Sequence, residues 1–584
     1  MDGDEIKLLI EELQRDVEAG QEGALRESLR RLLNLVERVV AENTRLREEN
    51  ELLRKQLKLP GPPAGAASPK SVTRDVSSEK ERRQRERKPP QKPDRRTFAD
   101  IPVQEERICP VDPAQLPPDA QFVGYEDVVV QELRMEPHNI RFRREIWFSA
   151  KEQRHIHAAL PPGFVGEFGP ELRSLLVSLK FVAGTSEPGA RELLEGFGVQ
   201  ISPASVSNIL LEAADLFHDD KRELFRAGLA STSYQHLDDT SATVNGQHWH
   251  THNLGNEFYT AYFTTPRKDR LTVLDVLRDF APRTYRWNDE TWRLLRALGV
   301  AEKWLVRLQT RVGREPERDW SQAEMDQLLD EFWPAQVSTS VDDEFAEELS
   351  SAAAAPSSPL SSSSPLRTHV LEATAIAAYH AQTTWPLPIL VCDDAAQFKL
   401  LTWELALCWI HQGRHYKKLT PVAPAHQRLL DDFRRQFWDY YAELQAFRRE
   451  PTVATAERLS VEFDRLFATH TGYDDLDDRI AKTREKQAEL LTVLRHPEVP
   501  LHNNPAELGA RVNARRRDVS LQTKNIRGTR AMDTLTSIVQ TAKKLGVRTC
   551  EYLRDRLTHR LALPSLATLI QSIAAARRLS LLKS

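Results

Sequence analysis

The residues best suited to chemistry lie in the segment 502–532, HNNPAELGARVNARRRDVSLQTKNIRGTRAM. Its opening predicts a helix, because the Asn504 side chain can cap a helix N-terminus and Pro505 suits the first helical position. Glu507 falls in the first turn, where the positive end of the helix dipole stabilises a carboxylate. The spacing from Asn504 to Glu507 also fits a capping box, so a purely structural role for this acid is the alternative.

Cations surround this acid in the sequence. Basic residues four and eight positions beyond Glu507 fall on the same side of the predicted helix, and others widen that side and continue into the following loop. An acid framed by cations at a helix start suits a phosphodiester that is bound through a metal ion. We predict phosphate contacts for five of these cations: Arg511, Arg515, Arg516, Lys524 and Arg527.

Two pairs of acids lie upstream, each beside a predicted strand. In the segment 234–265, strand alternation puts Asp238 on one face of the first strand of a β-meander. Asp393 follows the short apolar run 387–391, and a strand that ends in an acid delivers it to the carboxyl edge of a sheet. Each acid has an acidic neighbour, and the choice within each pair stays open: Asp239 beside Asp238, and Asp394 beside Asp393.

The bulk composition narrows the class of protein. A chain of 584 residues should hold several domains, and a formal net charge of −4 means that any attraction to a polyanion must come from local basic patches. Four scattered cysteines without a Cys-x-x-Cys pair argue against a disulfide scaffold. No apolar run approaches the ~20 residues of a membrane span, and no signal-peptide pattern opens the chain. We expect a cytoplasmic protein with no membrane partner.

The N-terminal arm carries a heptad pattern over residues 25–57. It predicts a two-stranded coiled coil, in which asparagine at a core position fixes the register and favours a dimer. A single amphipathic helix packed on a domain is the alternative. The core positions are Leu29, Leu32, Val36, Val39, Asn43, Leu46, Asn50 and Leu53.

A helix-turn-helix is predicted before the first acid. Residues 187–197 read as a short helix, and Ser202 with Pro203 begins a second one that continues to Phe217. The early exposed residues of such a second helix read bases, which singles out Ser205 and Asn208 for DNA contacts. A plain helical hairpin fits the same pattern.

Composition and residue patterns predict a series of domains along the chain. We expect an N-terminal helix and dimeric coiled coil over 1–59, a basic disordered linker over 60–100, a small β-rich module like a degenerate zinc finger over 101–160, and a helix-turn-helix-like DNA-binding region over 161–230. The first part of a core follows over 231–279, a helical insertion with a Ser- and Pro-rich tether over 280–366, the second part of the core over 367–420, a second helical insertion over 421–500, and the third acidic block with C-terminal helices over 501–584.

Three blocks of this sequence resemble those of the insertion-sequence 66 family of DDE transposases. They are HLDDTSATV, LVCDDAAQF followed by CWIHQGRHYKKL, and HNNPAELGARVNARRR with KNIRGTRAMDTLTSIVQTAKKLGV. The heptad arm and the segment ISPASVSNIL are similar to the family as well, so the resemblance runs from residue 25 to about 550. It implies a mixed α/β fold, with a ribonuclease-H-like core that carries large helical insertions and follows a coiled coil and a helix-turn-helix-like region.

The resemblance also implies the chemistry. Asp238, Asp393 and Glu507 would be the catalytic acids and would hold two Mg²⁺ ions, with Mn²⁺ as a substitute, for DNA cleavage at transposon ends and strand transfer into target DNA. Asp238 would bridge both ions, and the other two acids would each complete one. The implied partners are DNA, further copies of the chain through residues 25–57 in a homodimer or higher oligomer, and helper proteins. Nucleoid association follows from DNA binding.

The sequence departs from the family in two places. The family usually has paired cysteines after the linker, whereas this chain has only Cys109 there. The acids that follow Asp238 and Asp393 are aspartates instead of the usual Glu and Gly. Two other functions remain open: a ribonuclease-H-like nuclease or resolvase that cuts without joining, and a captured, catalytically inactive dimeric DNA-binding protein.

Overall fold

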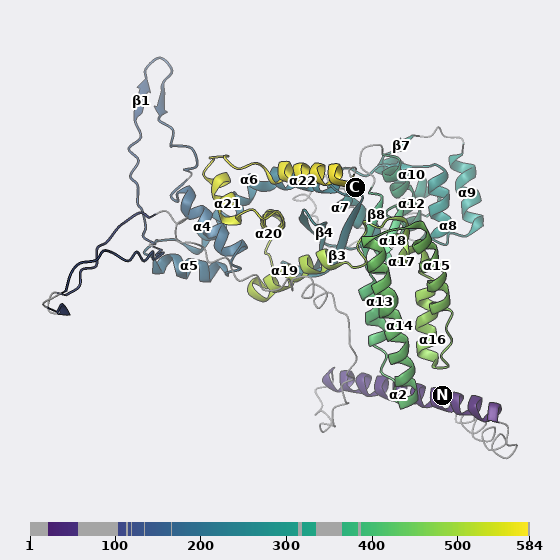
Figure 1. Ribbon diagram of the computed structural model, residues 1–584. Helices are drawn as coiled ribbons and strands as arrows, with labels where there is room; N and C mark the ends of the chain where they lie inside the picture. Colours follow the sequence, from purple (N-terminus) through teal and green to yellow (C-terminus); the bar gives the residue numbers. More distant parts are fainter. Residues whose placement is uncertain are drawn as a thin grey trace.

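A five-stranded mixed sheet forms the centre of the protein in the computed structural model (Figure 1), with the strands in the order β5-β4-β3-β8-β9. β3, β4 and β5 are antiparallel neighbours, whereas β8 and β9 run parallel to β3. This confirms a mixed α/β fold. The strands are β3 (Tyr234–Val244), β4 (Gln247–Gly255), β5 (Thr260–Thr265), β8 (Ile389–Cys392) and β9 (Glu404–Leu407). The structure describes residues 22–56, 103–112, 115–117, 120–133, 135–164, 166–313, 318–333, 365–382 and 387–581.

The β3–β4 hairpin follows from its turn residues. Asn245 and Gly246 both have positive φ, at 47° and 76°, as a two-residue type I′ turn requires. The next strand, β5, pairs antiparallel with β4 and completes the β-meander expected within 234–265. β9 falls inside a stretch that the sequence did not single out as a strand, because four residues are too short for a clear periodicity.

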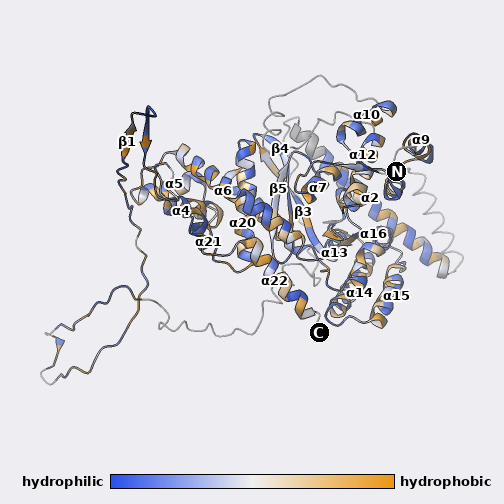
Figure 2. Cartoon of the chain, turned by 90° about the horizontal axis from the view of Figure 1, so that it is seen from above, coloured by the Kyte–Doolittle hydropathy of each residue, from blue (hydrophilic) through white to orange (hydrophobic). Residues whose placement is uncertain are grey.

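Helices flank the sheet on both sides. One side of the sheet is covered by α6, α20 and α22, and the other side by α7 and α12, as both Figure 1 and Figure 2 show. α19 packs on β3 and β4. The elements outside the two insertions are α4 (Pro170–Phe181), α5 (Glu187–Gly196), α6 (Pro203–Leu229), α7 (Arg270–Leu277), α12 (Pro365–His380), α19 (Asn504–Ser520), α20 (Ile526–Lys544), α21 (Thr549–Leu557) and α22 (Leu566–Leu581).

Two helical insertions lengthen the chain, one between β5 and β8 and the other between β9 and α19. In the first, Trp287 and Trp320 are buried and form part of the core. In the second, aromatic side chains build a separate core around Trp409, Phe437 and Phe463. The first contains β6 (Tyr285–Arg286), α8 (Asp289–Ala297), α9 (Glu302–Val312), β7 (Asp319–Trp320) and α10 (Gln322–Phe332). The second, preceded by the 3-10 helix η3 (Ala396–Phe398), contains α13 (Trp409–Lys417), α14 (Pro424–Arg449), α15 (Val453–Phe467), α16 (Asp474–Arg484), α17 (Gln487–Leu490) and α18 (Thr492–Arg495).

The predicted helix-turn-helix segment folds as two helices, α5 and α6. Ser202 caps α6 as expected, because its Oγ accepts a hydrogen bond of 3.0 Å from the backbone N–H of Ser205. The second helix does not end at Phe217 but continues to Leu229. Its later turns pack against α20 and α22, so tertiary contacts extend it past the predicted end.

The other predicted segments have mixed outcomes. Within 101–160 one exposed hairpin forms, from β1 (Ile146–Ser149) and β2 (Arg154–His157). No other paired strand is present among the described residues of this region, so it is less β-rich than expected. The linker over 60–100 and the Ser- and Pro-rich stretch up to residue 364 lie outside the described residues. No described helix has the length and hydropathy needed to cross a bilayer.

Candidate active site

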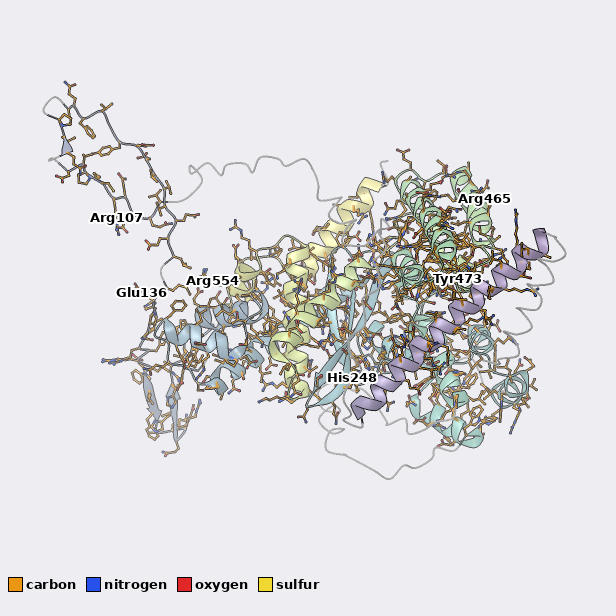
Figure 3. The ribbon with its side chains drawn as sticks, turned by 90° about the horizontal axis from the view of Figure 1, so that it is seen from below. Arg107, Glu136, His248, Arg465, Tyr473 and Arg554 are labelled. Carbon is orange, nitrogen blue, oxygen red and sulfur yellow. The ribbon has the colours of Figure 1, made fainter. Side chains whose placement is uncertain are left out.

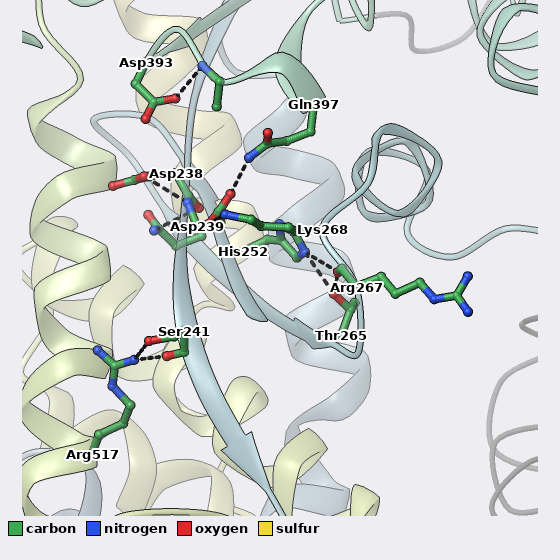
Figure 4. A network of polar contacts seen from close by, with 12 residues as sticks. Asp238, Asp239, Ser241, His252, Thr265, Arg267, Lys268, Asp393, Gln397 and Arg517 are labelled. Carbon is green, nitrogen blue, oxygen red and sulfur yellow. Dashed lines mark hydrogen bonds and ion pairs between the residues drawn. The ribbon is translucent and has the colours of Figure 1, made fainter. Parts of the chain in front are cut away.

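β3 and β8 bring two of the predicted acids to the same level of the sheet. The strands are parallel, and His236 pairs with Val391. Asp238 and Asp393 each lie two residues further along, so Asp393 leaves the end of β8 beside the point where Asp238 stands on β3. Figure 4 shows the two side chains in this arrangement.

Contacts with cations separate the members of each aspartate pair. Asp239 lies 3.3 Å from Lys268 Nζ and accepts a hydrogen bond of 2.7 Å from Gln397 (Figure 4). Asp394 is ion-paired with Lys399 and Lys486. Among the residues that the structure describes, no cation pairs with the other member of either pair, Asp238 or Asp393. Within the described part of the chain, the uncompensated charge of each pair therefore lies on Asp238 and on Asp393.

The uncompensated charge changes the pKa values of the acids. Burial, and then the nearby charge of Asp393, raise the pKa of Asp238 from 3.8 to about 7, and Glu507 contributes to the same increase. Burial also raises the pKa of Asp393. By contrast, although burial opposes it, contact with Lys486 and Lys399 lowers the pKa of Asp394. The site thus gathers carboxylates that repel one another and would be stabilised by a bound cation.

The start of α19 places the third acid, and it differs from the predicted helix start. Asn503, not Asn504, is the N-cap residue, and its side chain does not cap the helix. Its side-chain amide instead faces the sheet. The Nδ2 atom donates a hydrogen bond of 2.8 Å to the carbonyl oxygen of Leu237, and the Oδ1 atom lies 3.0 Å from His236 Nδ1. The side chain is fully buried, so α19 is tied to β3 at the residue before Asp238.

The capping-box explanation for Glu507 is wrong. α19 has no side-chain capping bond, and the carboxylate of Glu507 points into the site, where Arg414 donates a hydrogen bond of 3.0 Å to its Oε2 atom. The other oxygen, Oε1, is buried and has no hydrogen-bond partner within the described part of the chain. A buried carboxylate oxygen without a donor is what a metal-ligating acid looks like before its ion is bound.

Next to Glu507 lies a set of ligand-type side chains. The ligand atoms of Cys408, His411 and Glu507 all lie within 4.8 Å of one another. However, Arg414 approaches His411 Nε2 at 3.0 Å, which makes that nitrogen the acceptor and leaves the proton of the neutral ring on Nδ1. Nδ1 faces Glu507 Oε1 at 3.7 Å and so presents an N–H instead of a lone pair. The arrangement orients Glu507 and does not form a ready zinc site.

Gly509 allows α19 to approach the sheet closely. A Cβ atom at this position would lie 2.7 Å from Asn253 Oδ1, and Asn253 pairs with Asp238 across β3 and β4. The hydroxyl of Tyr262 also donates a hydrogen bond of 3.1 Å to the Gly509 carbonyl oxygen. A larger residue would push the helix, and with it Glu507, away from the aspartates.

Gly509→Ala should therefore lower activity more than it lowers stability. Overpacking of this kind costs about 1–3 kcal/mol, whereas displacing a catalytic group by a fraction of an ångström reduces rates about ten- to hundredfold. Thermal unfolding and DNA-cleavage rates measure the two effects. Gly196→Ala is the matched control, because the space around that helical glycine is open. Equal cleavage rates for wild type and Gly509→Ala would contradict the close approach.

Four of the five predicted phosphate-contacting cations are exposed: Arg511, Arg515, Lys524 and Arg527. Arg527 also forms an ion pair of 2.7 Å with Asp215 on α6. Arg516 is the exception and a correction to the prediction. Its guanidinium bonds the Phe181 carbonyl and Thr536 and lies over the Phe181 ring, and burial lowers its pKa to about 10. The helical pattern could not show that α4 and α20 cover this side of α19.

The two candidate base-reading residues lie at the start of α6. Ser205 is half-buried and its hydroxyl lies 2.9 Å from that of Ser202, whereas Asn208 is exposed. Sequence reasoning missed Asn503 and gave Arg414 no specific partner. The side-chain contacts that matter are long-range, because Arg414 reaches Glu507 across 93 residues and Asn503 reaches Leu237 across 266 residues. The basic His-Gln-Gly-Arg stretch beside Cys408 was the one available signal.

Comparison with known proteins places the chain in a family. A family model described as Transposase IS66 family matches residues 372–531, which include Asp393 and Glu507. An uncharacterized protein, y4jO of Sinorhizobium fredii (strain NBRC 101917 / NGR234), is 30% identical over 334 residues, which cover 57% of this chain and 94% of that protein. No solved structure matches. The chain belongs to the Transposase IS66 family.

Proposed function

We propose that this transposase cleaves DNA at the ends of its mobile element and joins those ends to target DNA, with Asp238, Asp393 and Glu507 as a DDE triad. The observation that carries the proposal is the convergence of these acids, from two adjacent parallel strands and one helix, without cations beside the two aspartates. The strand order supports a ribonuclease-H-like core: three antiparallel strands, with the first acid on the first of them, followed by two parallel strands.

The residues of the site fit a divalent metal ion. Hard oxygen ligands suit Mg²⁺, and Mn²⁺ accepts the same set. Arg414 holds Oε2 of Glu507 but leaves Oε1 without a donor, and the raised pKa of Asp238 indicates a carboxylate that lacks a positive partner. Two such ions would stabilise the attacking and leaving oxygens of an in-line displacement at phosphorus. Because Asp238 interacts electrostatically with both of the other acids, it would contact both ions.

The chain's own groups have separate tasks in this proposal. Arg414 and His411 hold the Glu507 carboxylate in place before DNA arrives. Burial lowers the pKa of His411, which keeps its ring neutral. Lys486 and Lys399 neutralise Asp394, so the acid next to Asp393 does not compete for the ions. A water molecule would attack first, and the 3′-hydroxyl released would then attack target DNA.

DNA would lie along the exposed cations near the acids. Arg511 and Arg515 extend from the Glu507 helix, and Lys524 and Arg527 follow at the start of α20. Phosphate contacts of this kind position a strand without reading its sequence. Ser205 and Asn208 at the start of α6 would read bases, and pairing of two chains through the arm would bring two transposon ends together. Helper proteins and nucleoid association belong to the same proposal.

The decisive test is Mg²⁺-dependent cleavage of DNA that carries the element's own ends, with the wild-type chain beside Asp238→Ala. We expect cleavage by the wild type only. A strand-transfer assay with pre-cleaved ends then separates a transposase from a nuclease that cuts without joining. Binding of the ends without cleavage or joining by the wild type would overturn the proposal in favour of an inactive DNA-binding protein.

A further inference from the structure

The inner face of α2 (Glu22–Gln56) is bound to the second insertion by buried polar residues. Helix α14 begins after Ala423, which provides no capping side chain of its own. Instead the Glu37 carboxylate accepts hydrogen bonds of 2.9 Å from the backbone N–H groups of Val422 and Ala423, and lies 3.2 Å from His426 Nδ1. A carboxylate at a helix N-terminus also compensates the helix dipole, so α14 uses an acid from the arm as its cap.

A second helix of the insertion is capped in the same way. α16 begins after Tyr473, again without a capping side chain of its own. Asn34 Oδ1 accepts a hydrogen bond of 3.1 Å from the backbone N–H of Asp474. Asn34 Nδ2 donates a hydrogen bond of 2.9 Å to the Gly472 carbonyl oxygen. Tyr473 stacks on His426 with ring centroids 4.5 Å apart, which joins the two caps. Figures 1 and 3 show α2 crossing the end of the insertion near Tyr473.

The heptad positions lie on a different face of the same helix. Leu29, Val36 and Leu46 are 50%, 41% and 47% exposed, although they are apolar and lie at core positions of the heptad. Leu35, which belongs to the inner face, is only 4% exposed. The structure therefore divides α2 into an inner face that contacts the insertion and an outer seam in which Leu29, Val36 and Leu46 are exposed, while the intervening core positions Leu32 and Val39 are half-buried.

Charge complementarity identifies the occupant of the outer seam. Glu42 and Arg47 are both exposed and flank the seam on opposite sides, five residues apart. In a parallel two-stranded coiled coil, residues with this relation face each other across the two helices and form ion pairs. A second copy of the same helix, in parallel and in register, satisfies both these charges and the apolar seam.

We propose that α2 is a two-sided connector: Asn34 and Glu37 fix its inner face to α14 and α16, and its outer seam pairs in parallel with α2 of a second copy. The pairing of two chains belongs to the proposed function, and the inner-face attachment goes beyond it. The insertion reaches the acids, because α13 supplies Arg414 to Glu507, and Lys486, which follows α16, binds Asp394. Dimerisation thereby sets the position of the elements that hold the active-site carboxylates.

Full-length variants without DNA or metal test the two faces separately, so an inactive enzyme does not affect the readout. Asn34→Ala with Glu37→Ala should leave the dimer mass unchanged in light scattering, while hydrogen exchange in peptides 420–427 and 470–476 rises at least about tenfold as capping bonds are lost. Leu29→Glu with Val36→Glu should give a monomer with unchanged exchange there. Glu42→Gln, on the exposed side, is the control for the loss of an acid and should not alter exchange in either peptide.

A cysteine placed in the seam tests the orientation. Asn43 is exposed at a core heptad position, where the same residue of both strands meets in a parallel coiled coil. In a chain whose exposed Cys109 and Cys550 are replaced by serine, Asn43→Cys should give a covalent dimer on mild oxidation that the same chain with Asn43 does not give. A dimer without the cross-link would overturn the parallel pairing, a monomeric wild type would overturn the seam, and unchanged exchange after removal of both caps would overturn the inner-face attachment.

Discussion

Glu507→Gln should leave the protein folded and able to bind transposon ends while DNA cleavage falls at least about a hundredfold. The loss should exceed the ten- to hundredfold effect of residues that only orient a metal ligand, because glutamine keeps the shape of the side chain but removes the negative charge. Glutamine can still accept the hydrogen bond from Arg414, so the packing around α19 is preserved. Cleavage rates in Mg²⁺, measured beside end binding and thermal unfolding, separate these effects.

Two controls make the result specific. Asp518→Asn removes an exposed acid from the same helix and should leave the cleavage rate unchanged. Arg414→Lys keeps a positive charge but loses the fork that contacts both Glu507 and His411, so a loss of about ten- to hundredfold is expected from misplacement of the carboxylate. Wild-type cleavage by Glu507→Gln would remove this residue from the triad.

Asp238→Asn should make the metal-free protein more stable at pH 8, although it inactivates the enzyme. The pKa of Asp238 is about 7 in the folded chain against an ordinary 3.8, so its ionisation at pH 8 costs at most about 4 kcal/mol of folding free energy. Because the folded state binds this proton more tightly, the penalty grows as pH rises from about 4 to 7 and is absent below 3.8. Asparagine removes the penalty.

Thermal unfolding in a chelator, at pH 8 and near pH 4, tests this sign. The variant should melt higher than the wild type at pH 8, by about 1 °C for each kcal/mol recovered in a chain of this length, and the difference should shrink toward pH 4. Adding Mg²⁺ should stabilise the wild type more than the variant, because the variant keeps only two of the three carboxylates that would hold the ions. Asp239→Asn is the neighbouring control and should destabilise the fold at pH 8, since it removes the ion pair with Lys268. A lower midpoint for Asp238→Asn at pH 8 would show that its charge is already compensated.

The sequence alone determined the features that depend on neighbouring residues. The Asn245-Gly246 turn, the cap at Ser202 and the strand before Asp393 follow from local conformational preference, and the structure contains them. The positions of the acids on their elements follow from the same local patterns. The heptad of the arm is also local, but whether two chains pair through it remains a prediction.

Tertiary structure alone decided which of these side chains meet. It distinguishes Asp238 and Asp393 from their neighbours, because lysines from distant elements neutralise Asp239 and Asp394. It replaced the expected cap at Asn504 with Asn503, whose amide bonds β3, and it turned Arg516 inward onto α4 and α20. The N-terminal arm illustrates the difference. The heptad spacing predicts its seam, whereas only the folded structure shows that Asn34 and Glu37 attach it to the insertion. The physical reason is that periodicity and capping depend on residues within a few positions, whereas charge compensation and burial depend on segments that only the folded chain brings together.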